Sequence, residues 1–195
     1  GIAIGERLYG FFPMASHVVM QPGELSERGF TDAMPHRCEL PSLYNHYART
    51  QSEARELQQL EDQRCIFFPL FMTGYVIADL LLDNDWFGVQ QIVIGSASSK
   101  TGFSSAAFIR AAGFGGAIVG LTSDQNVAFS EALGCYDRVV CYSEVESVAN
   151  ELSAYIDIAG DVAVRARLHR RLQDNATQTL LVGATHWDQF GESVD

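Results

Sequence analysis

From residue 91 to residue 182 the sequence repeats one pattern: a short apolar run, a turn, and then a segment with helical periodicity. The apolar runs read as buried strands at 91–95, 116–121, 138–141, 154–158 and 179–182. The segments between them read as helices at 101–112, 123–133, 144–152 and 161–172. Apolar strands that alternate with helices are typical of a parallel sheet covered on both faces. Because crossovers are right-handed, the sequence predicts an α/β fold with a doubly wound, Rossmann-like parallel sheet.

The first part of the chain predicts β structure and turns instead. Short aromatic or β-branched runs at 7–12 and 16–21 are expected to be strands, and residues 24–41 are expected to be a loop. The polar segment 48–64 is expected to be a surface helix or a variable insertion. The apolar stretch 65–82 is almost long enough to span a membrane. Polar residues and a proline interrupt it, so we predict a buried helix at a domain junction.

Composition narrows the class of partner. Thirteen Lys and Arg residues face 24 Asp and Glu residues, which gives a formal net charge of −11. An excess of acidic groups disfavours binding to nucleic acid or to an anionic membrane. The four cysteines form no C-x-x-C pair, so we expect reduced thiols, no metal site and a cytoplasmic protein. The sequence lacks an initiator Met and a signal segment, and Gly1 is expected to be a processing boundary.

The turn after the first predicted strand, residues 95–102, is the candidate phosphate site. It is not G-x-G-x-x-G, but its small residues would let a pyrophosphate approach the backbone. Ser98, Ser99 and Thr101 add hydroxyl groups, and Lys100 is the only lysine in the chain. The alternative is that Ser99 or Lys100 merely caps the following helix.

The end of the second predicted strand bears on the choice of nucleotide. An acidic residue there would accept a hydrogen bond from a ribose 2′-OH and repel a 2′-phosphate. Thr122 and Ser123 occupy this position, Asp124 comes one step later, and Asn126 follows where a cation would suit a phosphate. The sequence therefore favours NADP(H) over NAD(H).

Three further groups of residues are weighed as candidates. His186 follows the fifth predicted strand and could polarise a substrate carbonyl, or it could be an ordinary loop histidine. Tyr44 lies in the string YNHY and could donate a proton, or it could anchor a loop. His169 and the arginines around it, in 165–171, are expected to form a solvated helix face. No G-x-S-x-G elbow is present, which makes hydrolysis improbable.

Several strings of the sequence resemble a known protein family. IVIGSASSKTGFSSAAFIRAAG, VGLTSDQNVAFSEALGCYDRVVCY, YIDIAG and LLVGATHWD resemble strand, turn and helix elements of the medium-chain dehydrogenase/reductase superfamily, in its zinc-independent quinone-oxidoreductase-like branch. PLFMTGYVIADLL resembles the junction helix of that superfamily, and residues 1–23 resemble the last strands of its β-rich, GroES-like substrate domain. The strings RLYGFFPMASHVVMQPG, SASSKT and GATHWD are closer still to the uncharacterised bacterial family DUF2855.

The resemblance implies a division into a partial substrate domain at 1–42, a connection at 43–66 and a dinucleotide-binding domain at 67–195. It implies an NADP(H)-dependent oxidoreductase that needs no zinc and transfers hydride to a carbonyl, enone or quinone. The alternative is a non-catalytic dinucleotide-binding or assembly domain. The resemblance also implies a piece of a larger protein and a possible homodimer, with a small-molecule substrate as partner. Carried over position by position, the cofactor-binding residues are Thr73, Ser98, Ser99, Lys100, Thr101, Thr122, Ser123, Asn126, Ala159, Gly183 and Ala184.

Overall fold

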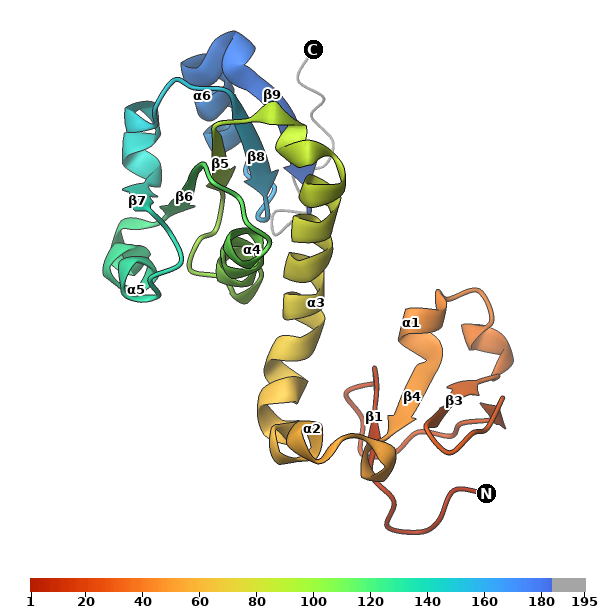
Figure 1. Cartoon of the computed structure of the whole chain (residues 1–195). Coiled ribbons are helices and arrows are strands. Elements are labelled where there is room, and N and C mark those ends of the chain that lie inside the picture. Colours follow the sequence, from red (N-terminus) through yellow and green to blue (C-terminus); the bar gives the residue numbers. More distant parts are fainter. Residues whose placement is uncertain (184–195) are drawn as a thin grey trace. The chain divides into compact units, whose positions relative to one another are not determined.

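The computed structural model describes residues 1–183, and the chain divides into two compact units, Gly1–Ile66 and Phe67–Asp195 (Figure 1). The first unit holds a four-stranded antiparallel sheet in the order β1-β4-β3-β2. Its strands are β1 (Leu8–Tyr9), β2 (Pro22–Gly23), β3 (Gly29–Asp32) and β4 (His46–Arg49). Its helical elements are η1 (Pro35–Arg37), α1 (Ser42–Asn45), η2 (Thr50–Ser52) and α2 (Arg55–Gln59).

The core of the first unit is small and aromatic. Phe30 of β3 and Tyr47 of β4 are each 1% exposed, and their rings stack with centroids 5.5 Å apart. The expected strand at 16–21 is absent, and β3 lies inside the expected loop 24–41, so both predictions are wrong. The hydrophobic pattern did not predict β3, because the strand contains a buried charged residue, Asp32. Its carboxylate accepts hydrogen bonds from the backbone N–H groups of Gln21 and Met34.

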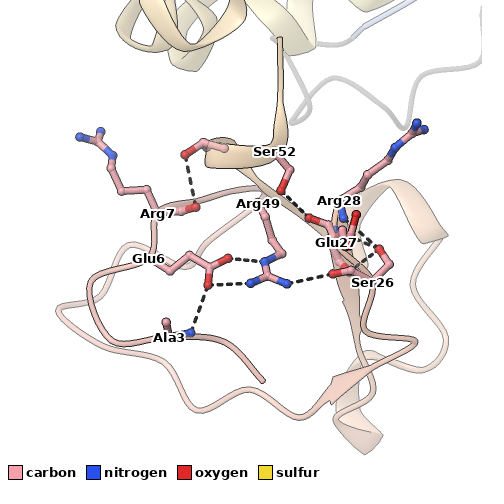
Figure 2. A network of polar contacts seen from close by, with 10 residues as sticks. Ala3, Glu6, Arg7, Ser26, Glu27, Arg28, Arg49 and Ser52 are labelled. Atoms are coloured by element: carbon pink, nitrogen blue, oxygen red, sulfur yellow. Dashed lines mark hydrogen bonds and ion pairs between the residues drawn. The ribbon is translucent and has the colours of Figure 1, made fainter. Parts of the chain in front are cut away.

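An ion pair fastens the N-terminal segment to this sheet (Figure 2). The carboxylate of Glu6 accepts hydrogen bonds from Nε and Nη2 of Arg49, and also from the backbone N–H of Ala3. Nη1 of Arg49 donates to the carbonyl of Ser26 at 3.0 Å. This guanidinium holds the pKa of Glu6 below its usual range. The two-residue strand β1 is thereby held by side-chain contacts as well as by backbone pairing.

The second unit confirms the predicted α/β fold with a doubly wound parallel sheet. Five parallel strands lie in the order β7-β6-β5-β8-β9 (Figure 1). They are β5 (Gln91–Ile94), β6 (Ala117–Thr122), β7 (Arg138–Cys141), β8 (Ser153–Asp157) and β9 (Ala176–Leu181). The helices are α3 (Glu61–Asp83), which starts in the first unit, then α4 (Lys100–Ala111), α5 (Val127–Ala132) and α6 (Val162–Leu172). Shorter 3-10 segments are η3 (Asp85–Gly88), η4 (Asp124–Asn126), η5 (Tyr142–Ser147) and η6 (Gln173–Asn175).

Alternate strand residues supply two separate cores, one on each face of the sheet. Ile92 and Ile94 pack with Ile109 of α4 on one face. Val93 packs with Leu168 of α6 on the other face. Both faces are apolar because each is covered by helices, which is why the strands lack a polar alternation in sequence.

The helix predicted at 144–152 is wrong, because the structure has the 3-10 segment η5 there. Val145 is buried within η5 and Val148 is buried directly after it, and this spacing of three suits a 3-10 turn. Glu144 departs from helical dihedral angles (φ −113°, ψ 23°) and kinks the segment. Two buried residues supply too little apolar surface to support a longer helix.

The apolar stretch 65–82 forms most of α3, and residues 61–64, the end of the polar segment, form its first turn. Within residues 1–183, α3 is the one helix long and apolar enough to span a membrane by length and composition, and 22% of that window is buried. The prediction of a buried helix is therefore wrong for most of its surface. Its contact with α4 is made at Gly74, where a Cβ would overlap the hydroxyl of Ser104.

Candidate functional site

The strand order places one turn at the carboxyl end of the central strand of the parallel sheet. From β5 the chain adds β6 and β7 on one side, then crosses to add β8 and β9 on the other side. The order therefore reverses at β5, and the turn from Gly95 to Ser99 leaves β5 at its carboxyl end. Ligands of doubly wound folds bind at this reversal, outside the carboxyl ends of the strands.

Hydrogen bonds to neighbouring strands hold the backbone of this turn. Ser96 has φ of +53°, a left-handed conformation that costs a residue with a Cβ free energy. Its N–H donates to the hydroxyl of Tyr142, just after β7, at 2.9 Å. The N–H of Ala97 donates to the carbonyl of Leu121 in β6 at 2.9 Å. The hydroxyl of Tyr136 donates to the carbonyl of Ala97 at 2.9 Å.

The start of α4 closes tightly on the turn. Ser99 is the N-cap residue, and its hydroxyl accepts a hydrogen bond from the N–H of Gly102 at 3.0 Å. A Cβ at Gly102 would lie 2.5 Å from the carbonyl oxygen of Ser96, so only glycine fits there without a shift. Ser99 therefore has the capping role weighed from the sequence. Lys100 and Thr101 follow in the first helical turn, where backbone N–H groups have no partner inside the helix.

The charge of Lys100 is available to a ligand. Its side chain is half-buried, and no ion pair joins it to an acidic residue within 1–183. An ammonium group beside a helix N-terminus favours an anionic ligand, because both contribute positive potential.

The end of β6 brings the second group of predicted residues to the turn. Thr122 is buried, and its hydroxyl donates to the hydroxyl of Ser98 at 3.3 Å. Nδ2 of Asn126 donates to the hydroxyl of Ser123 at 3.0 Å. Asp124 lies in η4 and is exposed. The tip of this strand is therefore lined by hydroxyl and amide groups.

Sequence reasoning missed the tyrosines that surround the turn. Burial raises the pKa of Tyr136 and of Tyr155 far above the usual value, so both hydroxyls stay protonated. A Cβ at Gly95 would lie 2.8 Å from the hydroxyl of Tyr155, which explains the glycine at the end of β5. One signal was available for Tyr142, since it directly follows a predicted strand and so had to lie at the carboxyl edge.

The loop after β8 is fixed by a buried carboxylate. Asp157 is 1% exposed, and it accepts from the N–H of Gly160 and from Nη1 of Arg165, each at 2.8 Å. Ala159 lies in this loop and is half-buried. Gly183 follows β9, and a Cβ there would lie 2.5 Å from the carbonyl oxygen of Ile158. The loops that carry Ala159 and Gly183 are thus neighbours at the same sheet edge as the turn.

The remaining predicted residues are not joined to this edge by the described contacts. Tyr44 belongs to the first unit, where its ring meets Phe11 edge-on at 5.1 Å and its carbonyl accepts from Arg37 at 2.6 Å. Thr73 lies on α3, and its hydroxyl donates to the carbonyl of Pro69 at 3.1 Å. Ala184 and His186 lie outside the described residues.

The expected solvated face of α6 is wrong. Its basic side chains mostly bond to the protein: Arg165 to Asp157, Arg167 to η5, Arg171 to the carbonyl of Val148 and His169 to the hydroxyl of Thr179. The sequence showed a run of charge, but the partners lie on other elements, 8 to 25 residues away along the chain.

The described part of the chain has no group of three or more His, Cys, Asp or Glu side chains that could hold a metal ion. Cys38 and Cys65 are exposed, Cys135 and Cys141 are half-buried, and all four are free thiols.

Comparison with known proteins identifies the family. The model of a family described as "Protein of unknown function (DUF2855)" matches residues 1–195. The chain belongs to the DUF2855 family. No curated protein matches this member of DUF2855.

Some solved structures resemble the DUF2855 chain in part. The quinone oxidoreductase from Coxiella burnetii aligns with a TM-score of 0.41 and 18% identity, over 56% of this chain and 42% of that one. Two structures of thermostable alcohol dehydrogenase from Pyrobaculum aerophilum also align. The cobalt- and zinc-bound one has a TM-score of 0.38 and 14% identity, over 57% of this chain and 39% of that one. The other has a TM-score of 0.40 and 14% identity, over 76% of this chain and 53% of that one. This chain thus spans between 39% and 53% of the length of these proteins.

Proposed function

We propose that this DUF2855 protein binds a nicotinamide dinucleotide, NADP(H) in preference to NAD(H), and is a zinc-independent oxidoreductase. The substrate class would be a carbonyl, an enone or a quinone. One observation carries the proposal: the turn from Gly95 to Ser99 leaves the central strand at the reversal of strand order and opens directly into α4. The sequence resemblance to quinone-oxidoreductase-like proteins supplies the reaction class.

The residues of this edge suit a dinucleotide. Lys100 and the first-turn N–H groups of α4 would meet the pyrophosphate, because both favour an anion. Ser98 is small and only half-buried, so a phosphate oxygen could approach the backbone at that position. Ala159 and Gly183, in the loops after β8 and β9, would lie along the nicotinamide half. When bound, the cofactor supplies the hydride, while the protein orients it and excludes water.

The end of β6 supports the preference for the 2′-phosphate. Ser123 and Asn126 present a hydroxyl and an amide group, which can donate to a phosphate without repelling it, while the buried Thr122 hydroxyl donates to Ser98. An acidic side chain at this tip would disfavour the phosphate by like-charge repulsion. Because these groups carry no positive charge, we expect a modest preference for NADPH rather than exclusion of NADH.

Titration of NADPH and NADH against the protein, followed by nucleotide fluorescence, tests the binding claim. The expected result is saturable binding with NADPH tighter than NADH. Lys100→Ala should weaken both nucleotides about tenfold or more, since a charge-assisted hydrogen bond contributes roughly 1.5–3 kcal/mol. Arg170→Ala is the matched control, because Arg170 is an exposed cation of the same unit on α6. If neither nucleotide binds, the proposal is wrong.

Activity is tested separately by following NADPH oxidation across a panel of enones, quinones and aldehydes. Turnover of any class that Lys100→Ala impairs would support the oxidoreductase. Tight NADPH binding without turnover on the panel would support a second candidate, a dinucleotide-binding domain that is not catalytic. One observation favours that candidate: the N–H of Ser96 and the carbonyl of Ala97 are already bonded to tyrosine hydroxyls. Fewer backbone groups of the turn are then free for a ligand than a glycine-rich turn would offer.

A further inference from the structure

The left-handed residue of the turn depends on a side chain from another loop. Ser96 stands where the backbone favours glycine, and its N–H donates to the hydroxyl of Tyr142 at 2.9 Å. The same hydroxyl lies 3.4 Å from Oγ of Ser96. The conformation of the turn is therefore coupled to the position of the Tyr142 ring, which η5 carries.

The segment η5 does not fix that position through its own backbone. Its dihedral angles leave the helical range at Glu144, so it is two short turns rather than one continuous helix. Val145 in its second half and Val148 directly after it pack into the core that α6 covers. Tyr142, in its first half, also packs against this core, and the carbonyls of Tyr142 and Ser143 have hydrogen-bond partners on another element.

Arg167 of α6 provides those partners. Its Nη1 donates to the carbonyl of Tyr142 at 2.9 Å, and its Nη2 donates to the carbonyl of Ser143 at 3.1 Å. Nε and Nη2 of the same guanidinium bond the two carboxylate oxygens of Glu146 at 2.7 and 2.5 Å. A planar guanidinium that bonds two adjacent carbonyls and a carboxylate fixes the backbone of η5 in both direction and distance.

We propose that Arg167 is the positioning residue of the candidate site: through Tyr142 it holds Ser96 in the left-handed conformation that shapes the turn. The effect of Arg167 on nucleotide affinity rests on the proposed function, whereas its effect on the Ser96 backbone does not.

The test compares Arg167→Gln with Arg171→Gln in the intact chain. Arg171 is the matched control, because it lies on the same helix and also donates to a carbonyl at the end of η5, that of Val148, at 2.8 Å. Hydrogen exchange at the Ser96 amide, measured by NMR, is the direct readout. Arg167→Gln should speed that exchange about tenfold, the effect of weakening one hydrogen bond, and Arg171→Gln should leave it unchanged.

Nucleotide titration is the second readout. Arg167→Gln should weaken NADPH binding about tenfold. In a Tyr142→Phe background, which lacks the hydroxyl, Arg167→Gln should cause no further loss, because the path to Ser96 is already cut. Arg167→Lys should not restore binding, since an ammonium cannot bond two carbonyls and a carboxylate in one plane.

The outcomes separate the two claims. If the wild type binds neither nucleotide, the proposed function fails, and the Ser96 exchange rates still decide the role of Arg167. Equal effects of the Arg167 and Arg171 variants on Ser96 exchange would overturn the positioning role. Should Arg167→Gln fail to fold, Tyr142→Phe alone must still speed Ser96 exchange, and the inference fails if it does not.

Discussion

Gly102→Ala measures how tightly the candidate turn closes on α4. A Cβ there would lie 2.5 Å from the carbonyl oxygen of Ser96 and 3.1 Å from Oγ of Ser99. The near atom is backbone, so the turn or the helix must shift, and such overlap typically costs about 1–3 kcal/mol. Alanine is the better helix former by about 0.8–1.0 kcal/mol, which acts in the opposite direction. The overlap offsets or exceeds the propensity gain, and we expect a net loss of up to about 2 kcal/mol.

Urea unfolding followed by circular dichroism measures this loss. With a slope of about 2 kcal/mol per molar urea, the midpoint should fall by up to about 1 M at unchanged slope. Gly115→Ala is the matched control: a Cβ there meets nothing within 4 Å, and its φ lies outside the left-handed region. That variant should gain about 0.4–1 kcal/mol by restricting the unfolded chain. If Gly102→Ala gains stability like the control, the close contact between the turn and α4 is refuted.

Three further predictions concern other parts of the second unit. Gln173 has φ of 51° and ψ of −125°, a region that glycine tolerates best, so Gln173→Gly should raise the melting temperature by about 2–4 °C and Gln173→Ala should not. Asp157→Asn should destabilise the chain by about 1.5–3 kcal/mol in urea unfolding, because it removes the charged partner of Arg165 and keeps an acceptor for the loop N–H. Arg167 lowers the pKa of Glu146 to about 2. The contribution of this ion pair to folding stability is therefore present above pH 4.5 and is lost as the pH falls towards 2. Unfolding measured across this range should show a shallower acid slope for Glu146→Gln, and an unchanged slope would contradict the ion pair.

The sequence alone determined the parallel sheet and the place of the turn. Apolar runs such as 91–95 can be buried on both faces only in a sheet covered by helices. The alternation of these runs with helical segments therefore predicted the fold. The pairing of Ser98 with Thr122 agrees with a fold in which both lie at the carboxyl ends of adjacent strands. These features are local or follow from the handedness of crossovers, which is why they can be read without coordinates.

Only the tertiary structure decided what surrounds that turn. The role of Tyr142 depends on η5 being a kinked 3-10 segment, and the role of Arg167 depends on carbonyls 24 and 25 residues earlier in the chain. Strand β3 escaped prediction because a buried Asp32 breaks its apolar pattern. A charged residue looks solvated in sequence until its partner is known, and that partner is set by packing. The hydrophobic pattern therefore determined the parallel sheet of this protein, while long-range hydrogen bonds determined the geometry of its candidate site.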